Sequence, residues 1–193
     1  MSKARFCPAC AAPLVEREID HYVRSMCTGC GKILYRNPVP ATGCLVENRG
    51  TVLLARRKFE PWKGCWYVPS GFVEYGDEVE ETARREVKEE TGLVVELGPL
   101  FGVYSYFDDP RQDGIIILYR ATVVGGALEA GDDAAEVGFF PAYELPPAEQ
   151  IGFASHRQAL SEWRDEVLYG RLPPRAERAR SLLLDRGSSQ AAC

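Results

Sequence analysis

The stretch GFVEYGDEVEETARREVKEETGL, Gly71 to Leu93, carries the strongest structural pattern in this sequence. Residues 78 to 91 have the composition of a helix, and Gly92 follows where helices commonly end in a left-handed conformation. Asp77 stands where a capping side chain is expected, with Glu80 at the third helical position. The stretch therefore predicts a loop that leads into a capped helix.

The inward face of this predicted helix carries carboxylates where apolar side chains are expected. At about 100° per residue, positions 79, 83, 86 and 90 form one stripe. Val79 and Ala83 are apolar, whereas Glu86 and Glu90 are not, and Glu89 lies one step round the helix. Three like charges within one turn raise one another's pKa, unless cations keep them ionised. Hard divalent ions such as Mg2+ take oxygen ligands of this kind, so the stripe indicates a metal site.

The opposite face of the helix has the pattern of an ordinary solvated surface. It carries the charged residues Glu78, Glu81, Arg84, Arg85 and Lys88, with Glu81 four positions before Arg85. A bare glutamate triad is more often surface decoration than a metal site, and the helix alone leaves that alternative open. The glycines Gly71 and Gly76 favour the metal site, because a glycine-rich loop brings backbone close to an anionic ligand.

Two tight cysteine pairs near the N-terminus have the spacing of a zinc site. They follow the pattern C-x2-C-x16-C-x2-C and consist of Cys7, Cys10, Cys27 and Cys30. Four thiolates form a closed tetrahedral shell, and a module of about 30 residues cannot bury enough surface to fold alone. We therefore expect structural Zn2+. Two disulfides are the alternative, which a reducing compartment disfavours.

The segment between the cysteine pairs predicts a β-hairpin. Residues 14–17 and 21–26 read as strands around a turn at residues 18–20. Gly31 follows the second pair, where a turn needs a residue without Cβ. The N-terminal part therefore reads as a small zinc-ribbon β-hairpin module.

The rest of the chain predicts an α+β fold with a mixed sheet, because runs of strands are accompanied by few helices. Strand-like runs lie at residues 41–47, 51–56, 66–69, 94–97, 100–107, 115–124 and 137–140, and helical segments at about residues 154–168 and 176–184. We expect a zinc ribbon over residues 1–36, a main domain over residues 37–150, and a C-terminal helical extension with a disordered tail over residues 151–193.

Composition is that of a globular protein, with 46% hydrophobic and 26% charged residues among 193. No apolar run reaches the roughly 20 residues that span a bilayer, and the start has no secretory signal, so we expect a cytoplasmic protein without a membrane partner. A formal net charge of −5 gives no general electrostatic reason to bind nucleic acid. Nucleic acid is therefore not expected as a partner.

The spacing of the helix residues resembles a known family motif. Gly71, five residues, Asp77, seven residues and then REVKEETGL from Arg85 to Leu93 are similar to the Nudix box, GX5EX7REUXEEXGU with U aliphatic, except that Asp77 replaces the first glutamate. The resemblance covers about residues 40–147, and the cysteine module is similar to the ribbon of NADH pyrophosphatases and a related FAD/ADP-ribose group. It implies a Nudix-type α/β/α sandwich that hydrolyses a nucleoside diphosphate linked to another moiety.

The same resemblance implies a metal site built on the box helix, for Mg2+ or Mn2+. Glu86 and Glu90 would be the principal ligands and Glu89 an additional one. The carbonyl of Ser70, the residue before the box glycine, would complete part of the inner shell. Metal and carboxylates together would activate a water for attack on one phosphorus.

Two further roles are implied by the resemblance. Arg85 would orient the carboxylates with Asp77 as its partner, and because Asp is one methylene shorter than Glu, we expect that pair to be looser or water-mediated. Another carboxylate, as metal ligand or general base, usually comes from a loop before the last strand, where the acidic residues are Glu129, Asp132, Asp133 and Glu136. Alignment of the closing strand favours Asp133, with a plain Gly-Asp-Asp turn as the alternative.

The expected substrate is ADP-ribose or a related ADP-sugar, then FAD, then NAD(H). The Ser-Gln-Pro-Trp-Pro-Phe-Pro array of NADH pyrophosphatases is absent from residues 98–107. The Gly71 backbone is expected to approach the substrate. Tyr104, Tyr106 and Trp62 are candidates for stacking on a base or flavin, although aromatics at strand spacing more often belong to the core.

A different class of function also fits the sequence: a zinc ribbon that binds nucleic acid or protein, carried by an inactive Nudix scaffold. The ribbon has only a slight basic excess, and no aromatic–basic stripe runs through its sequence. Inactive scaffolds tend to lose metal ligands, whereas all three box glutamates are present. We therefore favour the enzyme, as a homodimer like many family members.

Overall fold

The computed structural model describes residues 4–170, in two compact units that divide between Pro38 and Val39. Each unit has a sheet of its own. The helical segment expected near residues 176–184 and the expected tail lie outside the described residues. The domain boundary expected at residue 150 stays a prediction.

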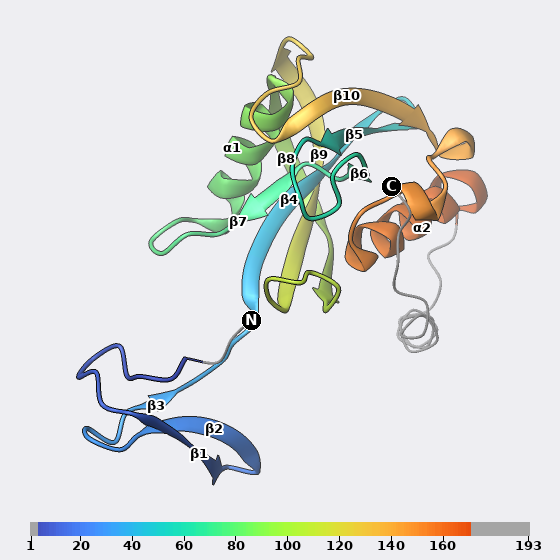
Figure 1. Ribbon diagram of the computed structural model, residues 1–193. Coiled ribbons are helices and arrows are strands. Elements are labelled where there is room, and N and C mark those ends of the chain that lie inside the picture. Colours follow the sequence, from blue (N-terminus) through green and yellow to red (C-terminus); the bar gives the residue numbers. More distant parts are fainter. Residues whose placement is uncertain (1–3, 171–193) are drawn as a thin grey trace. The chain divides into compact units, whose positions relative to one another are not determined.

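The N-terminal unit is a three-stranded antiparallel sheet in the order β1-β2-β3 (Figure 1). Its strands are β1 (Leu14–Ile19), β2 (Tyr22–Cys27) and β3 (Ile33–Leu34). The hairpin turn is at Asp20 and His21, whose φ angles of 53° and 65° are those of a tight two-residue turn, so the turn expected at residues 18–20 was placed too early. Gly31 has φ 72°, as its position after the second cysteine pair predicts.

The second unit contains a seven-stranded mixed sheet with the main path β10-β5-β4-β9-β8. Its strands are β4 (Val39–Asn48), β5 (Thr51–Arg57), β6 (Trp66–Tyr67), β7 (Ser70–Phe72), β8 (Leu93–Tyr106), β9 (Gly114–Gly126) and β10 (Ala134–Pro141). The β4–β9 pair is parallel and the other pairs are antiparallel. The expected mixed sheet is therefore confirmed.

A helix covers each face of this sheet (Figure 1), α1 (Val79–Thr91) on one and α2 (Ala154–Tyr169) on the other. Successive residues of β4 alternate between two cores: Cys44 and Val46 pack with the α1 cluster, whereas Leu45 packs with the α2 cluster. The expected α/β/α sandwich follows from this alternation and is confirmed.

Two local features differ from the strands expected from the sequence. The runs expected at residues 94–97 and 100–107 form one strand, β8, which ends at Tyr106 and in which the pairing with β9 shifts register around Gly98 and Pro99. Such shifts are bulges, and they accommodate a proline that cannot donate a ladder hydrogen bond. The short strand β7 was not expected. It pairs with β4 at Gly43, where a Cβ would lie 2.3 Å from the Pro69 oxygen.

Helix α2 is fixed to the sheet by a polar network at its buried face. Trp163 is fully buried, and its Nε1 donates to Oε1 of Glu47 at 2.6 Å. Arg120 donates to both oxygens of Glu47, at 2.8 and 3.1 Å, and also to Glu166 on α2. The helix expected at about residues 154–168 is confirmed. Within residues 4–170, no helix is both long and apolar enough to span a membrane.

Candidate functional site

The approach to α1 brings backbone directly against a carboxylate of the helix. A Cβ at Gly71 would lie between 2.2 and 2.5 Å from the carboxylate atoms of Glu86. Any other residue would therefore displace the carboxylate of Glu86, so glycine is required by a close approach. The backbone of Gly71 in β7 is therefore in contact with the Glu86 side chain of α1. The approach of this backbone to an anionic substrate stays a prediction.

Glu90 lies deepest in the site and is only 4% exposed. Its Oε1 accepts a hydrogen bond from the Tyr67 hydroxyl at 2.7 Å, and its Oε2 accepts one from the backbone N–H of Ser70 at 3.0 Å. Burial raises the pKa of Glu90 from 4.5 to about 8, while the two hydrogen bonds act in the opposite direction. A buried carboxylate of this kind favours either a proton or a cation.

Glu86 is half-buried beside it and closer to solvent. Burial raises the pKa of Glu86, and the neighbouring Arg85 lowers it. Arg85 donates to Glu86 at 3.4 Å and to Asp77 at 2.9 Å, and its Nε lies 3.9 Å from Glu89. One guanidinium therefore lies among three carboxylates, and the hydrogen bond that it donates to Asp77 raises the pKa of Arg85 further.

Asp77 corrects two expectations. It does not cap α1, because the N-cap residue is Glu78 and no side chain bonds the free N–H groups there. Its carboxylate instead accepts from Arg85 directly, so the pair is neither loose nor water-mediated. Glu81, expected to pair with Arg85, pairs with Arg84 at 2.6 Å.

Glu89 stands apart from the two inner glutamates. Its side chain is 48% exposed and turns toward Arg85. In the described part of the chain, donor atoms of three or more candidate metal ligands converge within 4.8 Å only at the cysteines, so the three glutamates are less tightly gathered. For Ser70, the structure shows the N–H bonded to Glu90, and the role expected of its carbonyl stays a prediction.

The loop between β9 and β10 carries Glu129, Asp132 and Asp133 over the end of α1, whereas the fourth acidic candidate, Glu136, lies in β10 and pairs with Arg56 at 3.3 Å. The N–H groups of Glu129 and Gly131 donate to the carbonyls of Thr91 and Glu90, each at 3.0 Å. Asp132 and Asp133 form the expected turn, with Asp132 at φ 44°. The charge of Asp132 contributes to the raised pKa of Glu86, and that of Asp133 to the raised pKa of Tyr67. Both carboxylates therefore act electrostatically on the site.

The aromatic candidates separate into core and half-buried groups. Tyr104 and Tyr106 are each 6% exposed in the core under α2, and the Tyr104 hydroxyl donates to Glu162 at 2.9 Å. Their burial disfavours stacking on a substrate, and the expectation that they bind substrate stays a prediction. Trp62 is half-buried, with its ring edge-on to Phe153 at 6.3 Å, and its Nε1 is buried without an acceptor among the described residues.

Three residues around the site were not found from the sequence: Tyr67 and Arg57, which act on the Glu90 carboxylate, and His156, which bonds the backbone of Val68. The N–H of Val68 donates to Nδ1 of His156 at 3.0 Å, and burial lowers the pKa of this histidine to about 3, so it is neutral. The Arg57 guanidinium lies 5.4 Å from the Tyr67 ring centroid. Of the three, only Tyr67 lies near the motif in the sequence, four residues before Gly71. Arg57 and His156 are distant from the motif in sequence, and tertiary packing brings them to the site.

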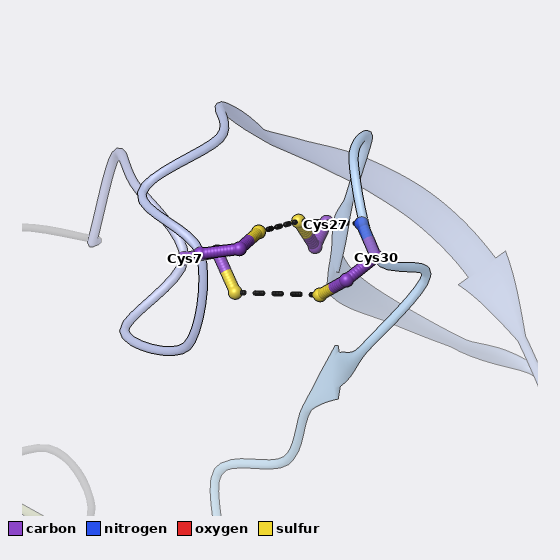
Figure 2. A group of neighbouring side chains, drawn as sticks. Cys7, Cys27 and Cys30 are labelled. Carbon is purple, nitrogen blue, oxygen red and sulfur yellow. Dashed lines mark hydrogen bonds between the residues drawn. The ribbon is translucent and has the colours of Figure 1, made fainter.

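The four cysteines of the N-terminal unit converge as their spacing predicts. Their sulfur atoms all lie within 4.8 Å of one another, with Cys7 and Cys30 at 3.8 Å and Cys10 and Cys27 at 3.4 Å. Figure 2 shows the labelled Cys7, Cys27 and Cys30 turned toward a common centre. These separations exceed a disulfide bond of about 2 Å, and all four thiols are free.

Backbone N–H groups prepare this cluster for thiolate charge. The N–H groups of Gly29 and Cys30 both donate to the Cys27 sulfur at 3.4 Å, and the N–H of Ala9 donates to Cys7 at the same distance. The hydrogen bond from Cys30 leads the causes that lower the pKa of Cys27 to about 6. Four thiolates around one centre match a closed structural zinc site and leave no open position for water.

Both units match models of one protein family. A NUDIX domain model matches residues 37–163, and a Nudix N-terminal zinc-ribbon model matches residues 5–36. The chain therefore belongs to the Nudix hydrolase family, and its cysteine cluster is the zinc ribbon of that family's N-terminal module.

Named relatives cover different shares of the chain. It is 48% identical over 114 residues to an ADP-ribose pyrophosphatase of Methanocaldococcus jannaschii, which is 58% of this chain and 68% of that protein. It is 40% identical over 144 residues to an NAD-capped RNA hydrolase NudC of Chromobacterium violaceum, which is 74% of this chain and 52% of that protein. The chain thus spans about half the length of this NudC relative.

A solved structure supports the same assignment. The crystal structure of a NUDIX hydrolase from Nitrosomonas europaea superposes with a TM-score of 0.74 at 30% identity, covering 84% of this chain and 92% of that one.

Replacing Cys27 with Ser should remove bound zinc and unfold the ribbon, because structural zinc contributes on the order of 10 kcal/mol to such modules. Zinc content and thermal unfolding measure this. Cys44→Ser is the matched control: Cys44 is fully buried in the second unit, so this change should lower stability and leave zinc bound. Retention of zinc and of ribbon folding by Cys27→Ser would contradict a structural metal.

Replacing Tyr67 with Phe should weaken Mg2+ binding more than it weakens the fold, because it removes the hydrogen bond from the tyrosine hydroxyl to Glu90. A hydrogen bond to a charged group is worth enough to raise the Mg2+ concentration for half-maximal activity by about ten-fold. Tyr104→Phe makes the same chemical change at a buried tyrosine–glutamate bond in the α2 core. It should lower the melting temperature alone, and an equal shift in Mg2+ requirement would show that Tyr67 has no special role.

The raised pKa of Glu90 predicts a pH dependence of stability in Mg2+-free buffer. Between pH 4.5 and about 8, the folded state retains a proton at Glu90 that the unfolded chain has lost. The free energy of unfolding therefore falls as pH rises through this window. Thermal melts should show a steeper fall for the wild type than for Glu90→Gln, in buffer without chelators that would strip zinc. Parallel pH profiles would refute the buried-carboxylate account.

Proposed function

We propose that this Nudix hydrolase cleaves the pyrophosphate bond of a nucleoside diphosphate linked to another moiety, with Mg2+ or Mn2+ as cofactor. The observation that carries the proposal is the pairing of Glu86 and Glu90 against the backbone of Ser70 and Gly71. Burying two carboxylates at one backbone approach is costly without a cation. A ligand set made only of oxygen atoms suits a hard divalent ion.

Glu86 and Glu90 would hold the metal, with Glu89 and the Ser70 carbonyl as further ligands. When bound, the metal neutralises phosphate charge and lowers the pKa of water. Glu90 is oriented for this by Tyr67 and the Ser70 N–H, which occupy one lone pair on each oxygen and leave the others free. Rotation of Glu89 away from Arg85 would bring a third carboxylate to the ion.

The chain's own residues also supply orientation and a proton acceptor. Arg85 bridges Asp77 and Glu86, so it holds the Glu86 carboxylate against Gly71. Asp133, on the loop packed over the end of α1, is our proposed general base or additional ligand, and Asp132 on the same turn is the alternative. Either carboxylate would accept the proton of the attacking water.

ADP-ribose or a related ADP-sugar is the proposed substrate. The 48% identity over 114 residues to the ADP-ribose pyrophosphatase of Methanocaldococcus jannaschii supports this choice. FAD and NAD(H) are the alternatives, and the 40% identity to a NudC protein supports the second of these, including an NAD group joined to RNA. The relatives therefore keep nucleic acid open as part of a substrate, contrary to the expectation from net charge.

A hydrolysis panel of ADP-ribose, FAD, NADH, NAD+ and NAD-capped RNA tests the proposal, with Glu90→Gln as the inactive variant. We expect Mg2+-dependent turnover, greatest with ADP-ribose, and a loss of at least about 100-fold in kcat on removing this ligand. Glu81→Gln is the matched control on the outer face of α1, where Glu81 pairs with Arg84.

The control variant should retain wild-type kcat. Near-normal turnover by Glu90→Gln would overturn the site assignment. Absence of Mg2+-dependent turnover on the whole panel would favour the inactive scaffold.

A further inference from the structure

Two arginines face each other across the ribbon hairpin. Arg17 on β1 pairs directly with Arg24 on β2, and residues paired in this way project from the same face of a sheet. Like charges directly opposite one another are destabilising. Neighbouring Glu16 and Glu18 lie opposite Ser25 and Val23 and project from the other face of the sheet, so no carboxylate of β1 or β2 shares the face of the two arginines.

Two exposed tyrosines flank these arginines on the same face. Tyr22 precedes Arg24 by two residues on β2, and Tyr35 follows the β3 residue that pairs with Ser25. The guanidinium carbon of Arg24 lies 5.1 Å from the Tyr22 ring centroid and 4.7 Å from that of Tyr35. The rings are 66% and 57% exposed, and Nε of Arg24 is buried without an acceptor among the described residues.

We call this surface the arginine–tyrosine face: Arg17, Tyr22, Arg24 and Tyr35. These residues are scattered in the sequence, and strand pairing brings them together, so the aromatic–basic stripe that the sequence did not show exists in the folded ribbon. Residues 4–38 hold five basic and three acidic side chains, a net charge of +2 in a chain of −5. Positive charge is therefore concentrated on the unit that bears this face.

We propose that the arginine–tyrosine face binds single-stranded nucleic acid. Exposed aromatic rings stack on unpaired bases, and arginines contact the phosphates between them. A bound phosphate would also relieve the repulsion between Arg17 and Arg24. In a duplex the faces of the bases are stacked on one another, and an acidic peptide has no bases. Both ligands could therefore pair with the arginines but could not stack bases on the tyrosines. This inference does not depend on the hydrolysis proposed for the second unit.

The test is binding of a labelled, uncapped RNA of about 10 nucleotides to the full-length, zinc-loaded protein, followed by fluorescence anisotropy in Mg2+-free buffer. Single-stranded DNA of the same sequence, the corresponding duplex and an acidic peptide of equal charge form the other arms. We expect both single strands to bind more tightly than the duplex and the peptide. A preference for RNA over DNA would identify the natural ligand.

Variants of the face should separate stacking from charge. Tyr22→Ala and Tyr35→Ala should each weaken binding by about five-fold or more, through lost stacking. Arg17→Ala should lower the slope of log affinity against log salt by about 0.7, the value for one phosphate contact on a single strand. Lys32→Ala is the matched control, since it removes one exposed positive charge of the ribbon outside the face.

Zinc content and ADP-ribose hydrolysis should be unchanged in all of these variants, so a failure here is distinct from a failure of the proposed enzyme. Equal binding of the peptide, or no effect of the tyrosine variants, would overturn the proposal in favour of a protein partner or diffuse charge. An equal loss in Lys32→Ala would refute the face as the site, as would affinity no tighter than about 0.1 mM, the weak limit of non-specific binding.

Discussion

The catalytic unit depends on one constraint: a carboxylate of a helix has to be buried against backbone and still remain available to a ligand. Glu86 lies against Gly71, and Glu90 is bonded to Tyr67 and the Ser70 N–H. Strand β7 has to be short and close to β4 to achieve this, which is why Gly43 lacks a side chain. Helix α2 fixes the segment just before β7, since Nδ1 of His156 accepts a hydrogen bond from the N–H of Val68. Elements far apart in sequence therefore converge on one acidic pair.

The sequence predicted the two inner glutamates, Glu86 and Glu90, but few of the residues that hold them in place. Helical periodicity placed Glu86 and Glu90 on the buried stripe, because the period of a helix is fixed by local geometry. It could not decide between two uses of Asp77, which reads equally well as a helix cap or as a partner of Arg85. The direct ion pair is formed, since a guanidinium among carboxylates is a stronger partner than the free N–H groups of the first turn.

The roles of the aromatic residues could not be predicted from the sequence, because they depend on contacts between elements and not on local geometry. Tyr104 and Tyr106 are two residues apart on β8 and so project from the same face of the strand, a spacing that suits core residues and binding residues equally. Only the packing of α2 shows that both are buried. Tyr22 and Tyr35 are far apart in sequence and meet only through strand register. Periodicity within one element reveals a face of that element, whereas surfaces assembled from several strands require the pairing between them.

The ribbon and the catalytic unit differ in how their buried acidic groups are set. In the ribbon, backbone N–H groups lower the pKa of Cys27 to about 6, while the hydrogen bond shared with Cys27 raises that of Cys10 to about 12, so Cys27 is the thiol of this pair that favours the charged form. In the catalytic unit, burial raises the pKa of Glu90 to about 8, so this carboxylate favours a proton when no cation lies beside it.

The bond from the Ser70 amide to Glu90 has a spectroscopic consequence. This amide donates to a side chain that titrates with a pKa of about 8, whereas most amides of the sheet donate to carbonyls that do not titrate. Its proton resonance in an NMR spectrum reports directly on the electron density of the Glu90 oxygen. A single backbone signal can therefore follow the protonation of Glu90 during a pH titration, without any probe being attached to the protein.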